Sequence, residues 1–200
     1  MKKLMDTYGL SQDLIIAYVL GYDYLKKKQL TDSLEAINKV KTNKEAIQIL
    51  THIKNIATYK RLAEFAGMPF PSKKQLSDED RQLFKEKGVP LFVEWYLEQH
   101  PYCCYCGVPE NLCKEKLQEQ GATRQGHRGS YLEVEKTNPD KTYTKDNCVL
   151  ACYLCNNAKT NFIQVQDFEP IAWGIYQFWT QNKKLKFAFP EEFWKNLKSK

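Results

Sequence analysis

The sequence predicts a mainly α-helical chain with one small α+β unit near its middle. Apolar residues recur three and four positions apart through most of residues 1–100 and again after residue 166, which is the spacing of amphipathic helices. Residues 102–162 break this pattern with polar, glycine-containing stretches, short alternating segments and paired cysteines. We therefore expect a helical module over 1–100, a compact ββα unit over 101–165, and helices over 166–200 that pack on it.

Composition and the N-terminal residues limit the classes of function. The formal net charge is +6 and the pI is near 8.8, which fits a polyanionic partner but also occurs in proteins without one. Residues 1–6 lead into no apolar signal core, and no apolar run approaches the ~20 residues of a membrane span. We expect no membrane association and a cytoplasmic protein with reduced thiols, a setting that favours metal binding over disulfides.

Capping residues and apolar stripes predict the first helices. Ser11 precedes a predicted helix over 11–28 that carries leucine, isoleucine and tyrosine on one face. Asn43 is expected to cap a further helix, whose apolar stripe continues as far as Phe65. A segment with two prolines follows this stripe and ends it, because proline cannot continue a helix.

The second part of the helical module contains a predicted break. Ser77 opens a helix with acidic residues in its first turn. We expect the segment 88–90, Gly-Val-Pro, to end that helix, and residues 91–99 to form the last one. No chemical motif lies in this module, so we expect it to position DNA or to bind a protein partner.

The central segment carries strand and turn signals. Residues 131–135 alternate between apolar and polar side chains, and 147–151 form a second short strand pattern. The Asn-Pro-Asp-Lys sequence at 138–141 is typical of a turn, and 155–163 is expected to be helical. Beyond this unit, Asp167 is expected to cap a helix, and Pro190 begins the last one. Their aromatic side chains are expected to be core, with base stacking as the alternative.

Two C-x-x-C pairs frame the central unit and predict a metal site. The pairs are Cys103 with Cys106 and Cys152 with Cys155. Four thiolates complete one tetrahedral coordination sphere, and zinc is the ion that such a closed sulfur site favours. A unit this small buries little apolar surface, so we expect bound zinc to supply much of its folding free energy.

Three cysteines lie outside the two pairs, and their role is less specific. Cys104, Cys113 and Cys148 are expected to be small buried residues. Cys104 or Cys113 is an alternative ligand, because each lies close in sequence to the first pair.

Acidic side chains of the predicted strand and polar side chains of the predicted helix are expected to converge in this unit. Glu133 and Glu135 share one face of the predicted strand, Asn156 follows the last cysteine, and Lys159 lies one helical turn later. A carboxylate and an amide oxygen suit a hard cation such as Mg²⁺ or Mn²⁺, which stabilises the leaving oxygen of a phosphodiester. The alternative for the two glutamates is an ordinary solvated strand face.

These residues resemble the zinc-knuckle (treble-clef) branch of the HNH endonuclease family, which has the ββα-metal fold. The resemblance covers about 60 of the 200 residues and is carried by Cys-Tyr-Cys-Gly, Leu-Glu-Val-Glu-Lys, Asp-Asn-Cys-Val-Leu-Ala-Cys and Cys-Asn-Asn-Ala-Lys. It implies that Glu135 is the acidic ligand of the catalytic metal, Asn147 the asparagine that braces the loop, and Asn156 the helix ligand. The four paired cysteines match the structural zinc site.

One departure from the family pattern affects catalysis. Lys136 stands where the family has its general-base histidine, and a lysine with a pKa of about 10.4 is a poor base at neutral pH. His127 or Glu133 is expected to take the role, unless metal and burial lower the pKa of Lys136 enough for catalysis. A third alternative is a unit that binds nucleic acid without cutting it. Relatives with a basic residue here imply a phage, mobile-element or defence setting.

The leading hypothesis is a metal-dependent endonuclease that hydrolyses DNA, with zinc as structural metal and Mg²⁺ or Mn²⁺ as catalytic metal. Lys159, Arg128 and Lys145 are expected to contact the nucleic-acid backbone, because lysine and arginine neutralise phosphates. The alternative is a non-catalytic zinc module that binds DNA, RNA or a protein. A third hypothesis is a helical interaction or toxin-like protein in which the zinc unit is only a staple.

Overall fold

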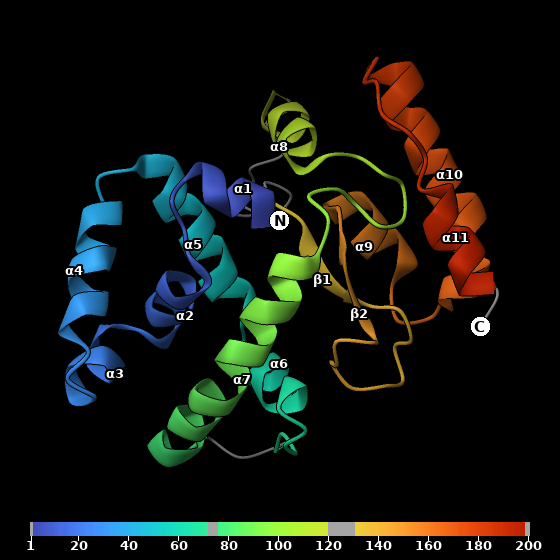
Figure 1. The fold of residues 1–200 in the computed structure, drawn as a ribbon. Helices are drawn as coiled ribbons and strands as arrows, with labels where there is room; N and C mark the ends of the chain where they lie inside the picture. The colour runs from blue at the N-terminus through green and yellow to red at the C-terminus, as the bar shows by residue number, and fades with distance from the viewer. Residues whose placement is uncertain (1, 72–75, 120–130, 199–200) are drawn as a thin grey trace. The chain divides into compact units, whose positions relative to one another are not determined.

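The computed structural model describes residues 2–71, 76–119 and 131–198 and divides into two compact units (Figure 1). The first unit comprises Met1–Gln99 with Tyr143–Asp146, and the second comprises His100–Thr142 with Asn147–Lys200. Helices dominate the described residues, and the strands among them form one two-stranded sheet, in agreement with the predicted fold class. In these parts of the chain, no helix combines the length and the apolar composition that a membrane span requires.

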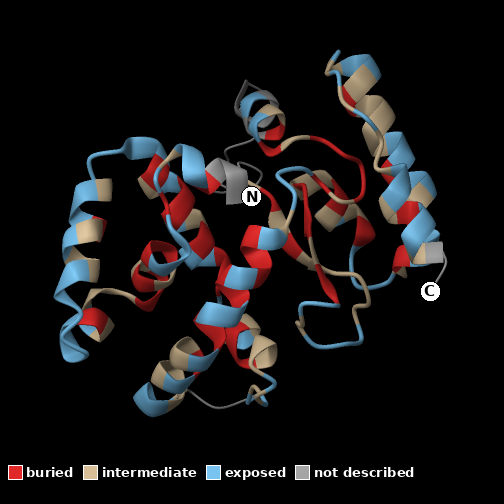
Figure 2. Cartoon of the chain, viewed as in Figure 1, coloured by how far each residue is buried: buried red, intermediate tan, exposed pale blue. Residues whose placement is uncertain are grey.

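The regular elements that the structure describes in the first unit are all helices. They are α1 (Lys2–Thr7), α2 (Gln12–Leu20), α3 (Tyr22–Lys27), α4 (Thr31–Val40), α5 (Lys44–Ile56), α6 (Tyr59–Phe65) and α7 (Asp78–Glu98). Three predicted caps are confirmed: the side chains of Ser11, Asn43 and Ser77 accept backbone N–H groups of the first turns of α2, α5 and α7. The apolar face of each of these three helices is buried, as Figure 2 shows.

Two predicted helices are divided in the structure. The helix expected over 11–28 breaks at Gly21, whose φ of 92° lies outside the helical region. The stripe expected to run from Asn43 to Phe65 breaks after Ile56, and Thr58 caps the new helix α6 by accepting the N–H of Arg61. Apolar spacing persists across both breaks, which is why the sequence pattern does not reveal them.

The predicted break at 88–90 is wrong, because α7 continues through Gly88 and Pro90. A proline inside a helix costs about 3 kcal/mol, whereas each large apolar side chain that is buried returns about 1.5–3 kcal/mol. Val89 and Phe92, on either side of Pro90, are both wholly buried. Packing of the continuous helix therefore outweighs the lost hydrogen bond.

The second unit holds the sheet and the remaining helices. They are α8 (Glu110–Glu119), β1 (Glu133–Lys136), β2 (Cys148–Ala151), α9 (Tyr153–Lys159), the 3₁₀ turn η2 (Val165–Asp167), α10 (Glu169–Gln177), the π-helical turn η3 (Phe178–Asn182) and α11 (Glu191–Lys198). Strands β1 and β2 are antiparallel, with Glu133 opposite Ala151 and Lys136 opposite Cys148. The predicted order of strand, turn, strand and helix is confirmed, and α8 is an element that the sequence pattern did not indicate.

An aromatic core joins the C-terminal helices to the first cysteine pair. Trp194 of α11 donates its indole N–H to the carbonyl of Tyr105 at 3.1 Å, and the Tyr105 ring lies edge-on to Phe168 at 5.2 Å. Trp179 and Trp194 are both at most 2% exposed. The core interpretation of these aromatic residues is therefore confirmed, although Trp173 on α10 is 44% exposed.

Gly88 provides a test of the packing between α6 and α7. A Cβ atom at this position would lie 2.2 Å from the carbonyl oxygen of Leu62, a backbone atom that cannot move aside cheaply. We expect Gly88→Ala to lower the free energy of unfolding by about 1–3 kcal/mol, measured by urea denaturation. The control is Gly174→Ala in α10, where a Cβ meets nothing within 4 Å and helix propensity adds up to about 1 kcal/mol. Equal stabilities of the two variants would contradict the close approach of α6 and α7.

Candidate metal centre and active site

The four paired cysteines converge on one point in the second unit. Cys103 and Cys106 lie in the segment between α7 and α8, Cys152 caps α9, and Cys155 lies within that helix. All four side chains are buried, and their sulfur atoms lie within 4.8 Å of one another. The predicted pairing of the two motifs around one centre is confirmed.

The arrangement of the sulfur atoms fits a tetrahedral ion. Metal–sulfur bonds of about 2.3 Å place the corners of a regular tetrahedron about 3.8 Å apart. Cys106 Sγ lies 3.8 Å from Cys152 Sγ. Burial opposes ionisation of Cys152, but hydrogen bonds from the thiols of Cys103 and Cys106 outweigh it and lower the pKa of Cys152. Such a set can hold a metal ion such as zinc.

Backbone hydrogen bonds hold the first cysteine pair beside the sheet. The Gly107 N–H donates to the Cys103 carbonyl at 2.9 Å, and the Cys104 N–H donates to Leu150 of β2 at 3.0 Å. Gly107 has a φ of 81°, and a Cβ atom there would lie 2.3 Å from the carbonyl oxygen of Ala188. A glycine is therefore needed both for the turn and for the approach of the C-terminal segment.

The spare cysteines lie outside the four-sulfur group. Cys113 of α8 and Cys148 of β2 are buried, and Cys104 is half-buried. The Cys113 thiol is hydrogen-bonded to the sulfur of Cys152, and that bond together with burial raises the pKa of Cys113. Cys113 therefore supports a member of the group from outside it, as a thiol that donates to a thiolate does around a metal.

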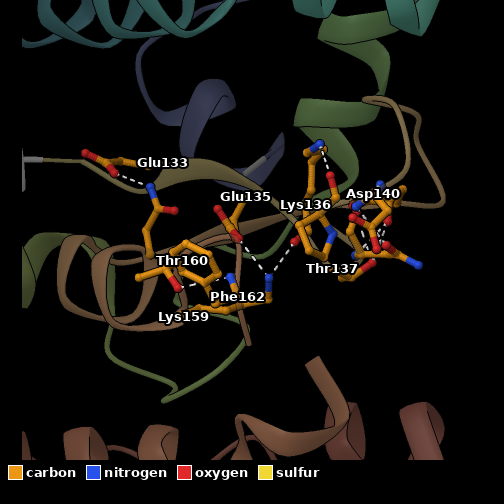
Figure 3. A network of polar contacts seen from close by, with 12 residues as sticks. Glu133, Glu135, Lys136, Thr137, Asp140, Lys159, Thr160 and Phe162 are labelled. Atoms are coloured by element: carbon orange, nitrogen blue, oxygen red, sulfur yellow. Dashed lines mark hydrogen bonds and ion pairs between the residues drawn. The ribbon is translucent and has the colours of Figure 1, made fainter. Parts of the chain in front are cut away.

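Strand β1 and helix α9 face each other with two matched polar pairs (Figure 3). Glu133 and Glu135 project from the same face of β1, while Asn156 and Lys159 are one turn apart on α9. The spacing of about 6–7 Å between alternate strand residues is close to the spacing of about 5–6 Å along a helix face. The Asn156 side-chain amide therefore donates to the carboxylate of Glu133, and the Lys159 ammonium donates to Glu135 Oε1 at 3.1 Å.

The second pair is deeply buried. The side chain of Lys159 is 0% exposed and that of Glu135 is 14% exposed. Lys159 also donates to the carbonyl oxygen of Lys136 at 3.0 Å, so its charge is compensated by a carboxylate and a backbone dipole. Opposite charges at this distance stabilise each other strongly when water is excluded.

Lys136 itself turns away from this face. Its ammonium group donates to the carbonyl oxygens of Pro139 and Lys141, the latter at 2.9 Å, and so closes the turn after β1.

Asn147, the residue just before β2, braces the same turn and is 6% exposed. Its Oδ1 accepts the N–H of Asn138 and the hydroxyl of Thr137, each at 2.9 Å. Its Nδ2 donates to the carbonyls of Asn138 and Thr142 at 3.0 and 2.9 Å.

Three predicted site residues remain. His127 and Arg128 are outside the described residues. Lys145 is exposed and belongs to the first unit. One contributor was missed by the sequence interpretation: Glu110 of α8, 8% exposed, accepts the N–H of Leu132 just before β1 at 2.9 Å. No spacing rule links Glu110 to a strand 22 residues further on, so only the fold reveals this contact.

Comparison with known proteins finds a similarity over part of the chain. No protein-family model matches the chain, and none of the curated proteins matches it significantly. A solved structure of the rare-cutting HNH restriction endonuclease PacI is similar, with a TM-score of 0.39 and 25% sequence identity. The similarity covers 48% of this chain and 66% of that one. Because a TM-score of 0.39 does not establish a shared fold, the function has to be inferred from the site itself.

Replacing one of the grouped cysteines tests the metal centre. We expect Cys106→Ser to lose bound zinc and to unfold the second unit. The reason is that zinc contributes about 10–16 kcal/mol in small zinc domains, which exceeds the stability of most domains. Metal analysis and near-ultraviolet circular dichroism measure the two effects. Cys104→Ser is the matched control, because its sulfur lies outside the group, and equal zinc loss from both variants would argue against the four-sulfur site.

Asn147 provides a test of the loop brace. In Asn147→Asp the side chain can no longer donate to the carbonyls of Asn138 and Thr142, and a negative charge faces them instead. We expect a loss of about 2–4 kcal/mol in the free energy of unfolding, measured by urea denaturation. Asn182→Asp, at an exposed position, is expected to change stability by less than about 0.5 kcal/mol. A stable Asn147→Asp protein would show that the turn does not depend on this side chain.

Proposed function

We propose that this chain is a metal-dependent endonuclease that hydrolyses DNA phosphodiester bonds, with zinc held by the four grouped cysteines as a structural ion. The observation that supports this proposal best is the pair of polar contacts between β1 and α9. The carboxylates of Glu133 and Glu135 and the amide of Asn156 lie together between β1 and α9. Two of the four grouped cysteines, Cys152 and Cys155, lie at the start of α9. Carboxylate and amide oxygens are the ligands that Mg²⁺ and Mn²⁺ prefer.

Glu135 and Asn156 are the proposed ligands of the catalytic cation. Lys159 holds Glu135 in one orientation, because its ammonium donates to that carboxylate and to the carbonyl of Lys136. Rotation of the Asn156 amide by 180° exchanges its nitrogen for its oxygen at the same position, so either end is available to a neighbour. A divalent cation at this face supplies positive charge to the phosphate and to the leaving 3′ oxygen.

Glu133 is the proposed general base. Lys136, at the position of the family's histidine, donates to two carbonyls of the turn and is therefore not directed at the face between β1 and α9. Glu133 is half-buried, lies two residues from Glu135 on the same strand face and contacts Asn156. A carboxylate in that position is able to accept the proton of a water that attacks phosphorus. His127, outside the described residues, is the alternative base.

Cleavage assays with the full chain test this assignment. We expect wild type to cut supercoiled plasmid with Mg²⁺ or Mn²⁺. Glu133→Gln is expected to slow cleavage by about 10²–10⁴-fold, the usual contribution of a general base, while its Mn²⁺ affinity stays near that of wild type. Glu135→Gln and Asn156→Ala should weaken Mn²⁺ binding as well, by at least the 10–100-fold that is typical of groups supporting a ligand. Calorimetric titration with Mn²⁺ separates the two effects.

Matched controls make the outcome specific. Asp140→Asn removes an exposed carboxylate from the turn after β1 and is expected to leave cleavage unchanged. His127→Ala is expected to keep cleaving if Glu133 is the base. Equal cleavage by wild type and Asn156→Ala would contradict the assignment of Glu135 and Asn156 as ligands of the cation. Cleavage of RNA in preference to DNA would show that the substrate is RNA.

A non-catalytic nucleic-acid-binding or protein-binding module is the second candidate function. The observation that favours it is the position of Lys136, whose ammonium group closes the turn where the family pattern has its base. Salt-sensitive binding of nucleic acid without cleavage under any divalent cation would select a nucleic-acid-binding module. In that case the paired residues of β1 and α9 stabilise the unit and perform no chemistry.

A further inference from the structure

The turn after α9 presents an aromatic side chain to solvent. Phe162 is 93% exposed, whereas the other large apolar side chains that the structure describes as exposed in the second unit are 36–44% exposed: Tyr102, Ile171 and Trp173. The free energy falls when an apolar side chain leaves water, so a phenyl ring held almost wholly in solvent is unfavourable in the isolated protein. A binding partner that covers the ring removes this cost.

The backbone before Phe162 is held in an unfavourable conformation that fixes the turn. Thr160, which ends α9, has a φ of 53°, a value that β-branched residues rarely adopt. Its hydroxyl accepts the N–H of Phe162 at 3.2 Å and so closes a local turn (Figure 3). Strain of this kind persists where the surrounding structure imposes it and is concentrated at functional sites.

The ring also lies close in sequence to the candidate active site. Lys159, whose ammonium contacts Glu135 at 3.1 Å, is three residues before Phe162. Three peptide units span at most about 11 Å, which corresponds to about three nucleotide steps of 3.4 Å along a strand. A phosphate bound at the face of β1 and α9 therefore brings neighbouring bases within reach of the ring.

We propose that Phe162 stacks on a nucleobase next to the phosphate bound at this face. This inference rests on the nucleic-acid partner of the proposed function but not on cleavage. A nucleobase offers one flat face to one ring, and an exposed aromatic or apolar side chain serves as a stacking platform or as a wedge between bases. A protein interface instead requires a contiguous apolar patch, and Phe162 is preceded by the exposed polar residues Thr160 and Asn161.

Binding measurements on the full zinc-loaded chain test the stacking role. Fluorescence anisotropy in Ca²⁺ compares a labelled thymidine oligonucleotide with an oligonucleotide of the same length built from abasic units, which keeps the phosphates and lacks the bases. We expect Phe162→Ala to raise the Kd for the thymidine oligonucleotide by about 5- to 150-fold and to leave the Kd for the abasic one unchanged. Phe162→Trp, which keeps a flat ring, is expected to bind both as wild type does.

Each other outcome overturns the inference. If Phe162→Ala weakens the binding of both oligonucleotides equally, or weakens the binding of neither, then the ring does not contact a base. If Phe162→Ala instead changes the elution volume of the protein in size-exclusion chromatography, the ring serves contacts between copies of the chain. If wild type binds neither oligonucleotide, this inference and the proposed function both fail. If the base-dependent loss is found but no nucleic acid is cut, stacking stands and hydrolysis fails.

Discussion

The constraint on which the second unit depends is the convergence of four buried sulfur atoms from two distant segments. Two of these cysteines come from the loop before α8 and two from the start of α9. An ion held between them would join segments whose nearest ligands, Cys106 and Cys152, are 46 positions apart in the chain. The sheet is only two strands of four residues each, and a two-stranded sheet is marginal by itself in water. A metal ion bound by the four sulfur atoms would supply the rigidity that this amount of apolar burial does not.

This rigidity has a direct chemical consequence on the face between β1 and α9. A strand and a helix present side chains at similar spacings, so fixing one against the other pairs Glu133 with Asn156 and Glu135 with Lys159. The lysine that ends β1 has another role, because the Lys136 ammonium group is bound by the carbonyls of the turn that follows. Charge on this face is thereby divided between a buried ion pair and a more accessible carboxylate–amide pair.

Support for this face comes from outside it as well as from the cysteines. Asn147 braces the turn between the strands with both ends of its amide, Glu110 holds the backbone just before β1, and the thiol of Cys113 donates to Cys152. Trp194 and Phe168 pack around Tyr105, which lies between Cys103 and Cys106 in the sequence. Each of these contacts is made to a segment that also carries a grouped cysteine or a residue of the face between β1 and α9. Loss of such a contact is therefore expected to shift that residue.

The sequence by itself determined the features that depend on local spacing. Two C-x-x-C pairs predict one sulfur centre, alternation predicts β1 and β2, and Ser11, Asn43 and Ser77 predict helix starts, because each signal is contained within a few residues. Tertiary structure decided what depends on distant partners. The burial of Val89 and Phe92 carries α7 through Pro90, the contact of Asn156 is with Glu133, and Lys159 is buried against Glu135. Such outcomes are set by packing between segments far apart in the chain, and residue spacing carries no information about that packing.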